Sequence, residues 1–487
     1  MRAGSNVPMA RLAWFTPLPP TPSGIAAYSA DLLPLVGRHH CVHAFVEPSP
    51  PGAQAAAQAL PGSAGLAVLP AHEVAWRHLR APYDLTVYQL GNASCHDFIW
   101  PHLARYPGLV VLHDGQLHHA RARRLLTHGR FDDYRAEFRY NHPDAPPDVA
   151  ELVIAALAGS TYYFYPMLRW VLRSARLVAV HSPGLARDLR EAYPGVELHT
   201  VRHGMGDPAG EHVTAAGRRL RRGLGIPDAA VLFGAFGLVT PEKRISAALR
   251  GLASLAADHP EAHLLLAGGT AAHYDAVAEA RALGVEERVH VTGYVADGDL
   301  PAWVGAADVC LCLRWPTGGE TSGTWLRAIA AGKPTVVTDL AHAAQTPSLD
   351  PTTWAVLPPT LPRPGTPPEP VSVSIDILDE NRRLALAMRR LASDAGLRGD
   401  LGRAARHYWT LHHTMTSAVD DYLRVIDRAL ERPVEVLRDV PAHLLPDPLE
   451  RARAVAAEMG AGVDVLHLTA ITPDDTLDCP NRGRSAS

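Results

Sequence analysis

The stretch that decides the fold is CLCLRWPTGGETSGTWLRAIAAGKPTVVTD, residues 310–339. An apolar run of strand length, Val309–Leu313, leads into a loop, Trp315–Gly319, that carries a proline and two glycines. A helix is expected next, because Thr321 and Ser322 are good N-cap residues and the glycine of AGKP suits a helix end. The β-branched run TVVT follows, so the stretch predicts a β-α-β unit.

The loop of this unit ends at a helix N-terminus, which offers unpaired backbone N–H groups and the positive end of the helix dipole. Such a terminus suits a phosphate group. Glu320 lies among these donors, and its carboxylate can accept hydrogen bonds from sugar hydroxyls. The alternative is that Glu320 only caps the helix, since acidic residues favour first turns. These residues alone leave both interpretations open.

The run GGETSGTWLRAIAAGKPTVVTD resembles the donor-binding segment of retaining, family-4-like (group 1) glycosyltransferases of the GT-B fold. The resemblance implies that Glu320 contacts the donor sugar, and that the amides of Thr321, Ser322 and Gly323 approach the sugar and the diphosphate. In the family a second glutamate, one or two helical turns later, holds the ribose. That position is Arg327 here, and Glu320 lies one residue closer to it than the usual spacing. The sugar-binding half of the pattern is therefore present, and the ribose-binding half is altered.

Composition limits the classes of protein that need to be considered. A length of 487 residues predicts roughly two to four domains, and 47% apolar residues are ample for full-sized cores. A net charge of −4 gives no basic field for nucleic acid. The five cysteines lack C-x-x-C spacing, so we expect neither a disulfide framework nor a zinc motif. Without an apolar signal segment or membrane-length run, we expect a cytoplasmic protein, with peripheral contact at the inner face of the membrane left open.

Alternating strands and helices in the first part of the chain predict a parallel, doubly wound sheet with ligands at the carboxyl ends of its strands. Gly24 follows the loop PLPPTPS at the start of a helix, where the backbone can come close to a ligand. The family has a similar glycine loop that faces the donor phosphates, so the resemblance implies the same contact for Gly24.

The predicted strand that begins at Leu109 ends in His113 and Asp114. The resemblance implies that His113 lies close to the donor sugar at the reacting face, and Asp114 is expected to orient its imidazole. His118 and His119 follow one turn later, where they either bind a metal or have a solvated or capping role. The second interpretation is favoured because the chain contains 26 histidines.

Residues 121–176 combine many aromatic side chains with arginines at helical spacing. Such a segment either docks on a membrane surface or takes a lipid-linked acceptor. The alternative is a set of ordinary helices whose arginine stems cover apolar neighbours, which is the favoured interpretation.

The second domain contains the only two lysines of the chain, Lys243 and Lys333. The resemblance implies that Lys243 clamps the donor diphosphate together with an arginine five residues earlier. Leu238 occupies that earlier position, so Arg244 and Arg314 are the candidates to compensate. The strand tips carry no D-x-D pair placed to hold a metal ion, so no metal and no other cofactor is expected.

The resulting prediction is an α/β protein of the GT-B class, with two Rossmann-like doubly wound domains facing across a cleft. The expected parts are an N-terminal acceptor-side domain (1–205), a linker (206–217), a C-terminal donor-side domain (218–405), a helix returning to the first domain (406–431) and a partly disordered extension (432–487).

The predicted activity is retaining transfer of a hexosyl-type sugar from a nucleoside diphosphate sugar to a glycan, lipid-linked or small-molecule acceptor, as in polysaccharide biosynthesis. The alternative is a non-catalytic scaffold of the same fold that binds a sugar or a partner protein. The sequence names neither the sugar, the base nor the acceptor. The predicted catalytic residues are His113 and Glu320, and the predicted donor-binding residues are Gly24, Lys243, Arg314, Thr321, Ser322, Gly323 and Arg327.

Overall fold

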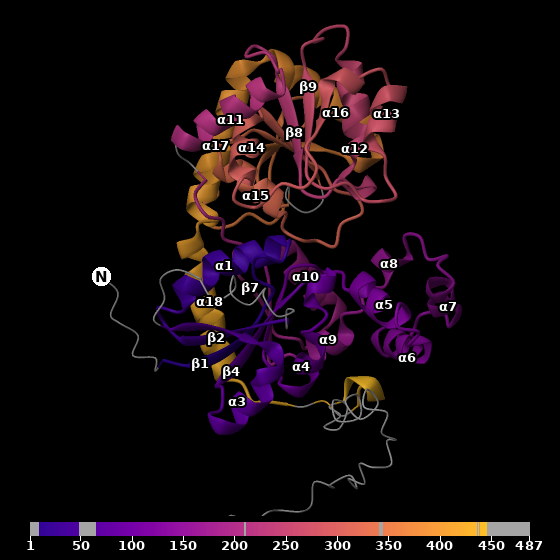
Figure 1. Ribbon diagram of the computed structural model, residues 1–487, viewed down its shortest axis with the longest axis vertical. Coiled ribbons are helices and arrows are strands. Elements are labelled where there is room, and N and C mark those ends of the chain that lie inside the picture. The colour runs from indigo at the N-terminus through magenta and orange to yellow at the C-terminus, as the bar shows by residue number, and fades with distance from the viewer. Residues whose placement is uncertain are drawn as a thin grey trace, which may run out of the picture.

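The computed structural model describes residues 9–47, 65–208, 211–339, 344–435, 437 and 439–445. Two α/β domains lie one above the other along the long axis of the molecule (Figure 1). The two predicted domains are therefore present. No helix in this described part of the chain is both long and apolar enough to cross a membrane.

The first domain is built on a seven-stranded sheet with the order β3-β2-β1-β4-β5-β6-β7. All of its neighbouring strands are parallel. The sheet consists of β1 (Arg11–Phe15), β2 (Cys41–Val46), β3 (Leu66–Pro70), β4 (Leu85–Leu90), β5 (Leu109–Leu112), β6 (Leu177–Val180) and β7 (Leu198–Thr200). Its larger helices are α1 (Gly24–Val36), α3 (Val74–Arg80), α4 (Trp100–Arg105), α5 (His118–Leu126), α6 (Phe131–Asn141), α7 (Asp148–Ile154), α8 (Thr161–Phe164), α9 (Arg169–Ser174) and α10 (Pro183–Ala192).

The second domain is built on an eight-stranded sheet with the order β10-β9-β8-β11-β12-β15-β13-β14. Only the β13–β14 pair at its edge is antiparallel. The sheet consists of β8 (Leu232–Phe236), β9 (His263–Ala267), β10 (Val289–Val291), β11 (Val309–Cys312), β12 (Thr335–Thr338), β13 (Ser348–Leu349), β14 (Val356–Leu357) and β15 (Ser372–Ile375). Its helices are α11 (Glu211–Gly223), α12 (Ile245–Ser254), α13 (Ala276–Ala282), α14 (Leu300–Ala306), α15 (Gly323–Ala330), α16 (Glu380–Ser393) and α17 (Ala395–His412).

The central strands of both sheets are buried on both faces, which explains their nearly continuous apolar runs. Each sheet reverses its strand order at one point, between β1 and β4 in the first domain and between β8 and β11 in the second. Crevices outside the carboxyl ends of parallel strands at such points are where ligands bind in open α/β sheets. The fold thus provides one such crevice on each domain.

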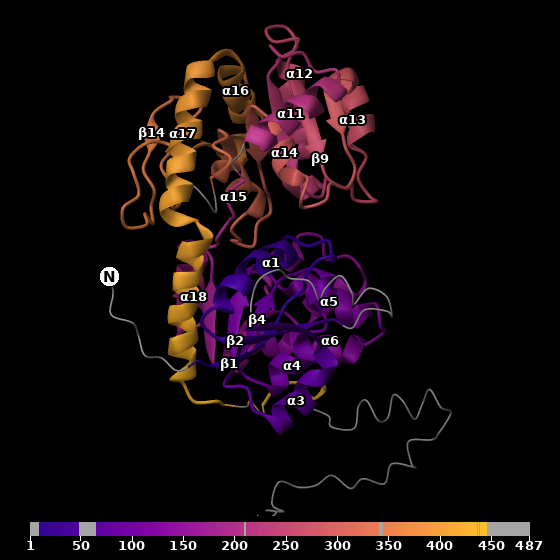
Figure 2. The ribbon, with the colours of Figure 1, turned by 60° about the vertical axis from the view of Figure 1, so that its left-hand side comes forward.

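Helix α18 (Met415–Leu430) returns from the second domain and packs on the first, against α1, β4, β5 and β6. Figure 2 shows α17 and α18 as one column beside both domains. The side chain of Asp421 on α18 accepts hydrogen bonds from Nε and Nη2 of Arg202 at 2.7 and 2.8 Å. This ion pair joins the returning helix to the segment that follows β7.

Several boundaries differ from the sequence prediction. Helix α11 occupies much of the expected linker 206–217 and packs against α14. Gly396 and Gly402 lie inside α17, which Asp394 caps by accepting a hydrogen bond from the amide of Leu397. Gly402 is needed there because a Cβ would lie 2.3 Å from the carbonyl oxygen of Gly332.

The segment from Pro347 to Pro370 is rich in proline, yet its first part does not form a surface loop. Ser348 and Leu349 are buried and join the sheet edge as β13, where they pair with β15. An amphipathic helix predicted at about Asp447–Met459 lies outside the described residues.

Candidate active site

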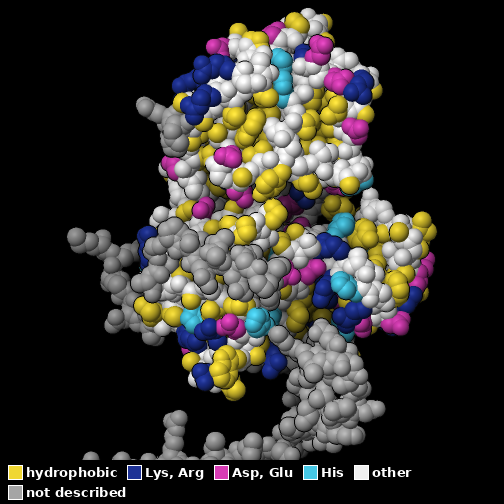
Figure 3. Space-filling view, viewed as in Figure 1, with side chains coloured by type: hydrophobic (Ala, Val, Ile, Leu, Met, Phe, Trp, Pro, Cys, Tyr) yellow, Lys and Arg dark blue, Asp and Glu magenta, His cyan; other side chains and the backbone are white. Residues whose placement is uncertain are grey.

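The carboxyl ends of the two sheets face each other across a cavity of ≈ 840 Å³ that is lined by both domains. The space-filling view shows the molecule hollowed between its two halves, with charged side chains at the opening (Figure 3). All nine residues predicted for the site line this cavity: His113, Glu320, Gly24, Lys243, Arg314, Thr321, Ser322, Gly323 and Arg327.

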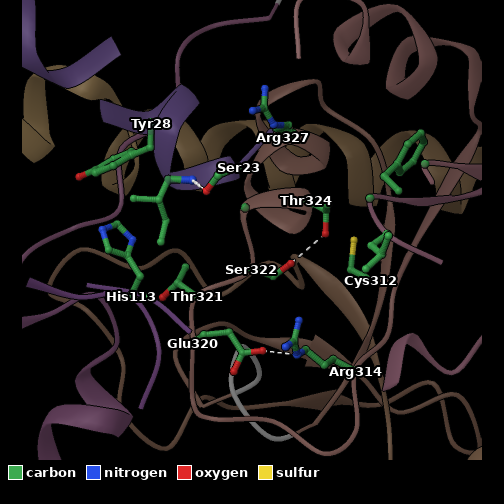
Figure 4. Close-up of a pocket in the computed structure, with 18 of the residues that line it drawn as sticks. Ser23, Tyr28, His113, Cys312, Arg314, Glu320, Thr321, Ser322, Thr324 and Arg327 are labelled. Carbon is green, nitrogen blue, oxygen red and sulfur yellow. Dashed lines mark hydrogen bonds and ion pairs between the residues drawn. The ribbon is translucent and has the colours of Figure 1, made fainter. Parts of the chain in front are cut away.

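Glu320 lies in the loop between β11 and α15, where it organises the loop. Its Oε2 accepts hydrogen bonds from Oγ1 of Thr317 and the amide of Gly318, both at 2.8 Å. Its Oε1 forms an ion pair with Nε of Arg314, seen in Figure 4. Ser322 caps α15 by accepting from the amide of Trp325. The alternative role of Glu320 as the helix cap is therefore wrong.

A backbone hydrogen bond joins the two domains beside the cavity. The amide of Gly115 donates to the carbonyl oxygen of Gly318 at 3.0 Å. Burial, and then the negative charge of the nearby Glu320, raise the pKa of the Asp114 carboxyl group to about 7. Asp114 accepts from the amide of Gln116 at 2.9 Å and so belongs to this contact.

His113 follows β5 and is oriented by Gln89 at the end of the neighbouring strand β4. Its Nε2 lies 2.6 Å from Oε1 of Gln89, which also accepts from the hydroxyl of Tyr422 at 3.2 Å. The expectation that Asp114 orients this ring is therefore wrong. Burial, and then the neighbouring rings of His181 and His203, lower the pKa of His113 well below its usual value. The ring is neutral at neutral pH.

Lys243 and Arg314 supply positive charge to the wall formed by the second domain. Burial, and then the charge of Arg314, lower the pKa of Lys243 to about 8. Its Nζ donates to the carbonyl oxygen of Phe236 at the end of β8. Arg244 is held elsewhere, because it forms a two-bond ion pair with Glu380 at 2.6 and 2.7 Å. Of the two arginines proposed to compensate for Leu238, only Arg314 lines the cavity.

Two helix N-termini, one from each domain, open onto the cavity. Gly24 begins α1 and has no atom within 4 Å of the position of a Cβ, so its backbone is open to a ligand. Gly323 begins α15 and is equally open. Oγ1 of Thr321 is buried and has no hydrogen-bond partner among the described residues. Amides and a hydroxyl without a partner at this position suit the oxygens of a phosphate or a sugar.

Arg327 lies on α15 and forms an ion pair with an acid from the segment after β10. Its Nη2 is 3.2 Å from Oδ1 of Asp297, whereas Glu320 pairs with Arg314. Glu320 and Arg327 do not share a helix face, because α15 begins at Gly323 and Glu320 lies in the loop. Figure 4 shows the two side chains well apart.

A second carboxylate, from the first domain, faces the same arginine. Burial raises the pKa of Asp31 on α1, the charge of Arg327 opposes that rise, and Asp297 adds to it. Asp31, Asp297 and Arg327 all line the cavity. The end of the cavity away from Glu320 therefore presents two carboxylates around one guanidinium.

His118 and His119, considered above as metal ligands, lie away from this cavity on α5. Nε2 of His118 is 2.7 Å from the hydroxyl of Tyr134, and the ring is fully buried. His119 stacks on Tyr162 with ring centroids 4.2 Å apart. The solvated or capping role favoured for His118 is also wrong, because its ring is part of a small core under the helices α5–α8.

The fold brings to the site further side chains that are not among the predicted site residues. Gln89 contacts His113, Asp297 contacts Arg327, and the ring centroid of Tyr28 lies 4.6 Å from that of His203. Gln89 lies near the end of β4 and His203 just after β7, so position at a strand end is the signal that indicates both. Asp297 follows β10 in an irregular segment, and no sequence pattern indicates that it meets a helix 30 residues later.

Comparisons with known proteins agree with this architecture. Residues 230–358 match the family model described as "Glycosyl transferases group 1". The curated mannosylfructose-phosphate synthase of Agrobacterium fabrum (strain C58 / ATCC 33970) is 33% identical over 181 residues. That alignment covers 34% of this chain and 38% of the relative, so the chain matches less than half of the relative's length.

Two solved structures are similar over nearly their whole length. HepE from Anabaena, in complex with UDP-glucose, has a TM-score of 0.57 at 16% identity, over 86% of this chain and 99% of that chain. Sucrose-phosphate synthase from Thermosynechococcus elongatus has a TM-score of 0.57 at 14% identity, over 86% of this chain and 98% of that chain. These likenesses establish that the two-domain fold is shared with these proteins.

Proposed function

We propose that the protein transfers a sugar from a nucleoside diphosphate sugar to an acceptor, because residues 230–358 match the group 1 glycosyltransferase family and the chain has the GT-B fold. Transfer proceeds with retention of the anomeric configuration, and the sugar is of the hexose type. The reaction requires no metal ion and no other cofactor. The acceptor is a glycan, a lipid-linked sugar or a small molecule.

The observation that carries the proposal is that one cavity combines Lys243, Arg314 and two open helix N-termini. As the glycosidic bond breaks, negative charge develops on the leaving diphosphate, and fixed positive charges and amides stabilise that charge. Lys243 and the amides of Ser322 and Gly323 hold the diphosphate, and Gly24 approaches it from the opposite domain. These groups take the place of a metal ion.

Glu320 and His113 face the donor sugar in this account. Glu320 accepts hydrogen bonds from the sugar hydroxyls, and the ion pair with Arg314 fixes the orientation of its carboxylate. Burial, and then the neighbouring imidazoles, keep the His113 ring neutral by lowering its pKa, and Gln89 holds its Nε2. The remaining nitrogen, Nδ1, can accept one hydrogen bond from a sugar hydroxyl without adding a charge.

Replacing His113 with alanine should lower kcat more than it weakens donor binding. The ring contacts the sugar at the reacting face, so its contribution is larger in the transition state than in the ground state. Steady-state kinetics and equilibrium donor binding for wild type and His113→Ala provide the comparison. A variant that loses affinity and keeps kcat would make His113 a binding residue only.

The nucleoside end of the donor lies near Arg327, where the family has a glutamate for the ribose. We infer that Asp297 supplies the carboxylate for the ribose hydroxyls and that Arg327 holds Asp297 in place. A guanidinium alone can only donate hydrogen bonds, whereas a carboxylate accepts from both hydroxyls of a ribose. The carboxylate that binds the ribose thus comes from the loop after β10, whereas in the family it comes from the helix that corresponds to α15.

Arg327→Glu should therefore transfer more slowly than Arg327→Ala, and neither should exceed wild type. A third carboxylate beside Asp297 and Asp31 adds repulsion, whereas alanine only releases Asp297. Transfer rates across a panel of nucleoside diphosphate sugars test this order. If Arg327→Glu outperforms wild type, the position is an altered ribose site and the scaffold interpretation gains.

The acceptor side is assigned to the first domain and to its helices α5–α9, which project beside it in Figure 1. Burial raises the pKa of Tyr163 on α8, and the charge of Arg314 opposes that rise, so α8 lies near the cavity. Phe164 and Leu157 are 78% and 72% exposed on the same layer. Arg121 is instead buried in a two-bond ion pair with Glu137 at 2.6 and 2.8 Å, which is a structural role. We infer that the exposed apolar side chains contact a lipid-linked acceptor or the inner face of the membrane.

Calorimetry with UDP-, GDP-, ADP- and TDP-sugars tests the proposed donor site. We expect at least one donor to bind at one site per chain and to compete with its own nucleoside diphosphate. If no donor and no nucleoside diphosphate binds to the folded protein, the cavity is not a donor site.

A further inference from the structure

Three histidines meet beside the proposed sugar position, at the carboxyl ends of three neighbouring strands. His113 follows β5, His181 follows β6 and His203 lies just after β7. The ring centroids of His181 are 4.6 Å from those of both His113 and His203. One ring nitrogen of each residue lies within 4.8 Å of the other two. This is the one group of three or more potential metal-binding side chains found among the described residues.

The hydrogen bonds of His113 and His181 leave each of these rings with one nitrogen lone pair that is not used. Nδ1 of His181 lies 2.9 Å from the carbonyl oxygen of Val201, which can only accept, so Nδ1 carries the proton and Nε2 a lone pair. Nε2 of His113 donates in the same way to Oε1 of Gln89, which leaves Nδ1 with a lone pair. Metal-bound histidines show this pattern, with one ring N–H donated to a carbonyl oxygen or a carboxylate.

Two ring nitrogens of the cluster have no hydrogen-bond partner in the described part of the chain. Nε2 of His181 and Nδ1 of His203 are buried and make no hydrogen bond there. The two residues are only 3% and 8% exposed. A buried polar atom without a partner is destabilising, so this ring cluster without a ligand is an unfavourable arrangement.

An aromatic side chain encloses the cluster. Tyr28 covers the group, with its ring 4.6 to 5.7 Å from the three imidazoles.

We propose that His113, His181 and His203 form a binding site for a divalent transition metal of the Zn²⁺, Ni²⁺ or Cu²⁺ class, and that metal bound there inhibits sugar transfer. Three imidazoles suit these ions and not Mg²⁺ or Ca²⁺, which prefer oxygen ligands. Zn–N bonds are about 2.0–2.1 Å long, so the rings draw together around the ion.

The position of the site explains how the metal ion enters and why it inhibits sugar transfer. His113 and His203 line the cavity, whereas His181 lies beneath them, so the ion enters from the cavity and keeps one coordination position open towards it. Metal binding takes the lone pair of His113 and places a positive charge at the sugar position. The inhibitory half of the proposal rests on the proposed function, and the binding half does not.

The test uses the untagged chain, freed of metal by a chelator, and Zn²⁺ alone without any nucleotide. Competition with a chromogenic chelator measures the affinity, and the absorption bands of bound Co²⁺ report the ligand geometry. We expect one tight site per chain, and at least tenfold weaker Zn²⁺ binding for His181→Gln. The double variant His263→Gln/His290→Gln is the matched control. It removes a different pair of neighbouring histidines, on β9 and β10, whose ring nitrogens are 3.0 Å apart. This double variant should bind Zn²⁺ like wild type.

Thermal unfolding of the metal-free variants shows whether they are folded. If His181→Gln is unfolded, His203→Gln replaces it with the same expected loss. Wild type that binds no Zn²⁺ at one site per chain, or His variants that bind it unchanged, overturns the metal site. If Zn²⁺ binds but does not slow nucleotide release from an active donor, the inhibitory half is overturned. A protein that binds Zn²⁺ and uses no donor keeps the site and contradicts only the proposed function.

Discussion

Replacing Lys243 with alanine should weaken binding of a nucleoside diphosphate by about tenfold to a hundredfold. The ammonium group of Lys243 stands at the end of β8, in the wall of the cavity beside Arg314. A hydrogen bond to a charged group contributes roughly 1.5–3 kcal/mol, which corresponds to this range of affinities. The loss should be smaller for the nucleoside monophosphate, which lacks the second phosphate. Calorimetry with both nucleotides measures the difference.

The other lysine of the chain provides a matched control. Nζ of Lys333 donates to the carbonyl oxygen of Gly305 at 2.8 Å, and Lys333 does not line the cavity. Lys333→Met should therefore keep donor affinity in the folded protein. Equal losses for the mono- and diphosphate in Lys243→Ala would contradict a role of Lys243 as diphosphate clamp.

The same lysine predicts a pH dependence. Because the pKa of Lys243 is about 8, its positive charge is present below that pH in the free protein and is lost as the pH rises through it. We expect kcat/KM for the donor to fall across this range in wild type and not in Lys243→Ala. Asp114, with a pKa of about 7, titrates in both proteins and cannot account for a difference between them.

Glu320→Gln should lower sugar transfer by about tenfold or more while the fold is retained. The substitution keeps the size of the side chain and removes the charge that strengthens hydrogen bonds from sugar hydroxyls, a contribution of roughly 1.5–3 kcal/mol. It also breaks the ion pair with Arg314, which fixes the carboxylate. Single-turnover rates with saturating donor measure the effect on the chemical step.

Glu279→Gln is the matched control for this substitution. Oε2 of Glu279 accepts from the hydroxyls of Ser246 and Tyr274, both at 2.7 Å, much as Glu320 accepts from Thr317. Glu279 lies on α13 and does not line the cavity, so its variant should transfer at the wild-type rate. Near-normal transfer by Glu320→Gln would show that Glu320 only stabilises its loop and does not contribute to transfer.

The sequence was sufficient to predict the central strands and the loop around Glu320. Apolar runs mark strands that are buried on both faces, so β11 and β12 were found within one residue of their ends. The strands β3, β13, β14 and β15 were not predicted. β13 and β14 have only two residues each and β3 is only half-buried, so these three have no burial pattern that a sequence can display.

Side-chain partners were predicted less well than positions. The resemblance led to the right cavity residues, but Gln89 and Asp297 hold His113 and Arg327 from other strands or loops. Those partners come from β4 and from the segment after β10, and local sequence does not specify which strands and loops lie side by side.

The scaffold alternative predicts binding without turnover, so turnover is the decisive property. Leu238 occupies the position of the family's clamping arginine, and its side chain is 55% exposed. The chain therefore has no guanidinium group at that position. Against this, His113, Lys243 and Glu320 line one cavity, although a scaffold has no need of all three.

The most direct measurement is release of nucleotide from the donor panel, with and without acceptors, by wild type and by Glu320→Gln. The account predicts acceptor-dependent release from at least one donor without added metal ion, a product with the anomeric configuration of the donor, and a drop of about tenfold or more for Glu320→Gln. Binding of a donor with no release under any condition, or release that Glu320→Gln leaves unchanged, would contradict it.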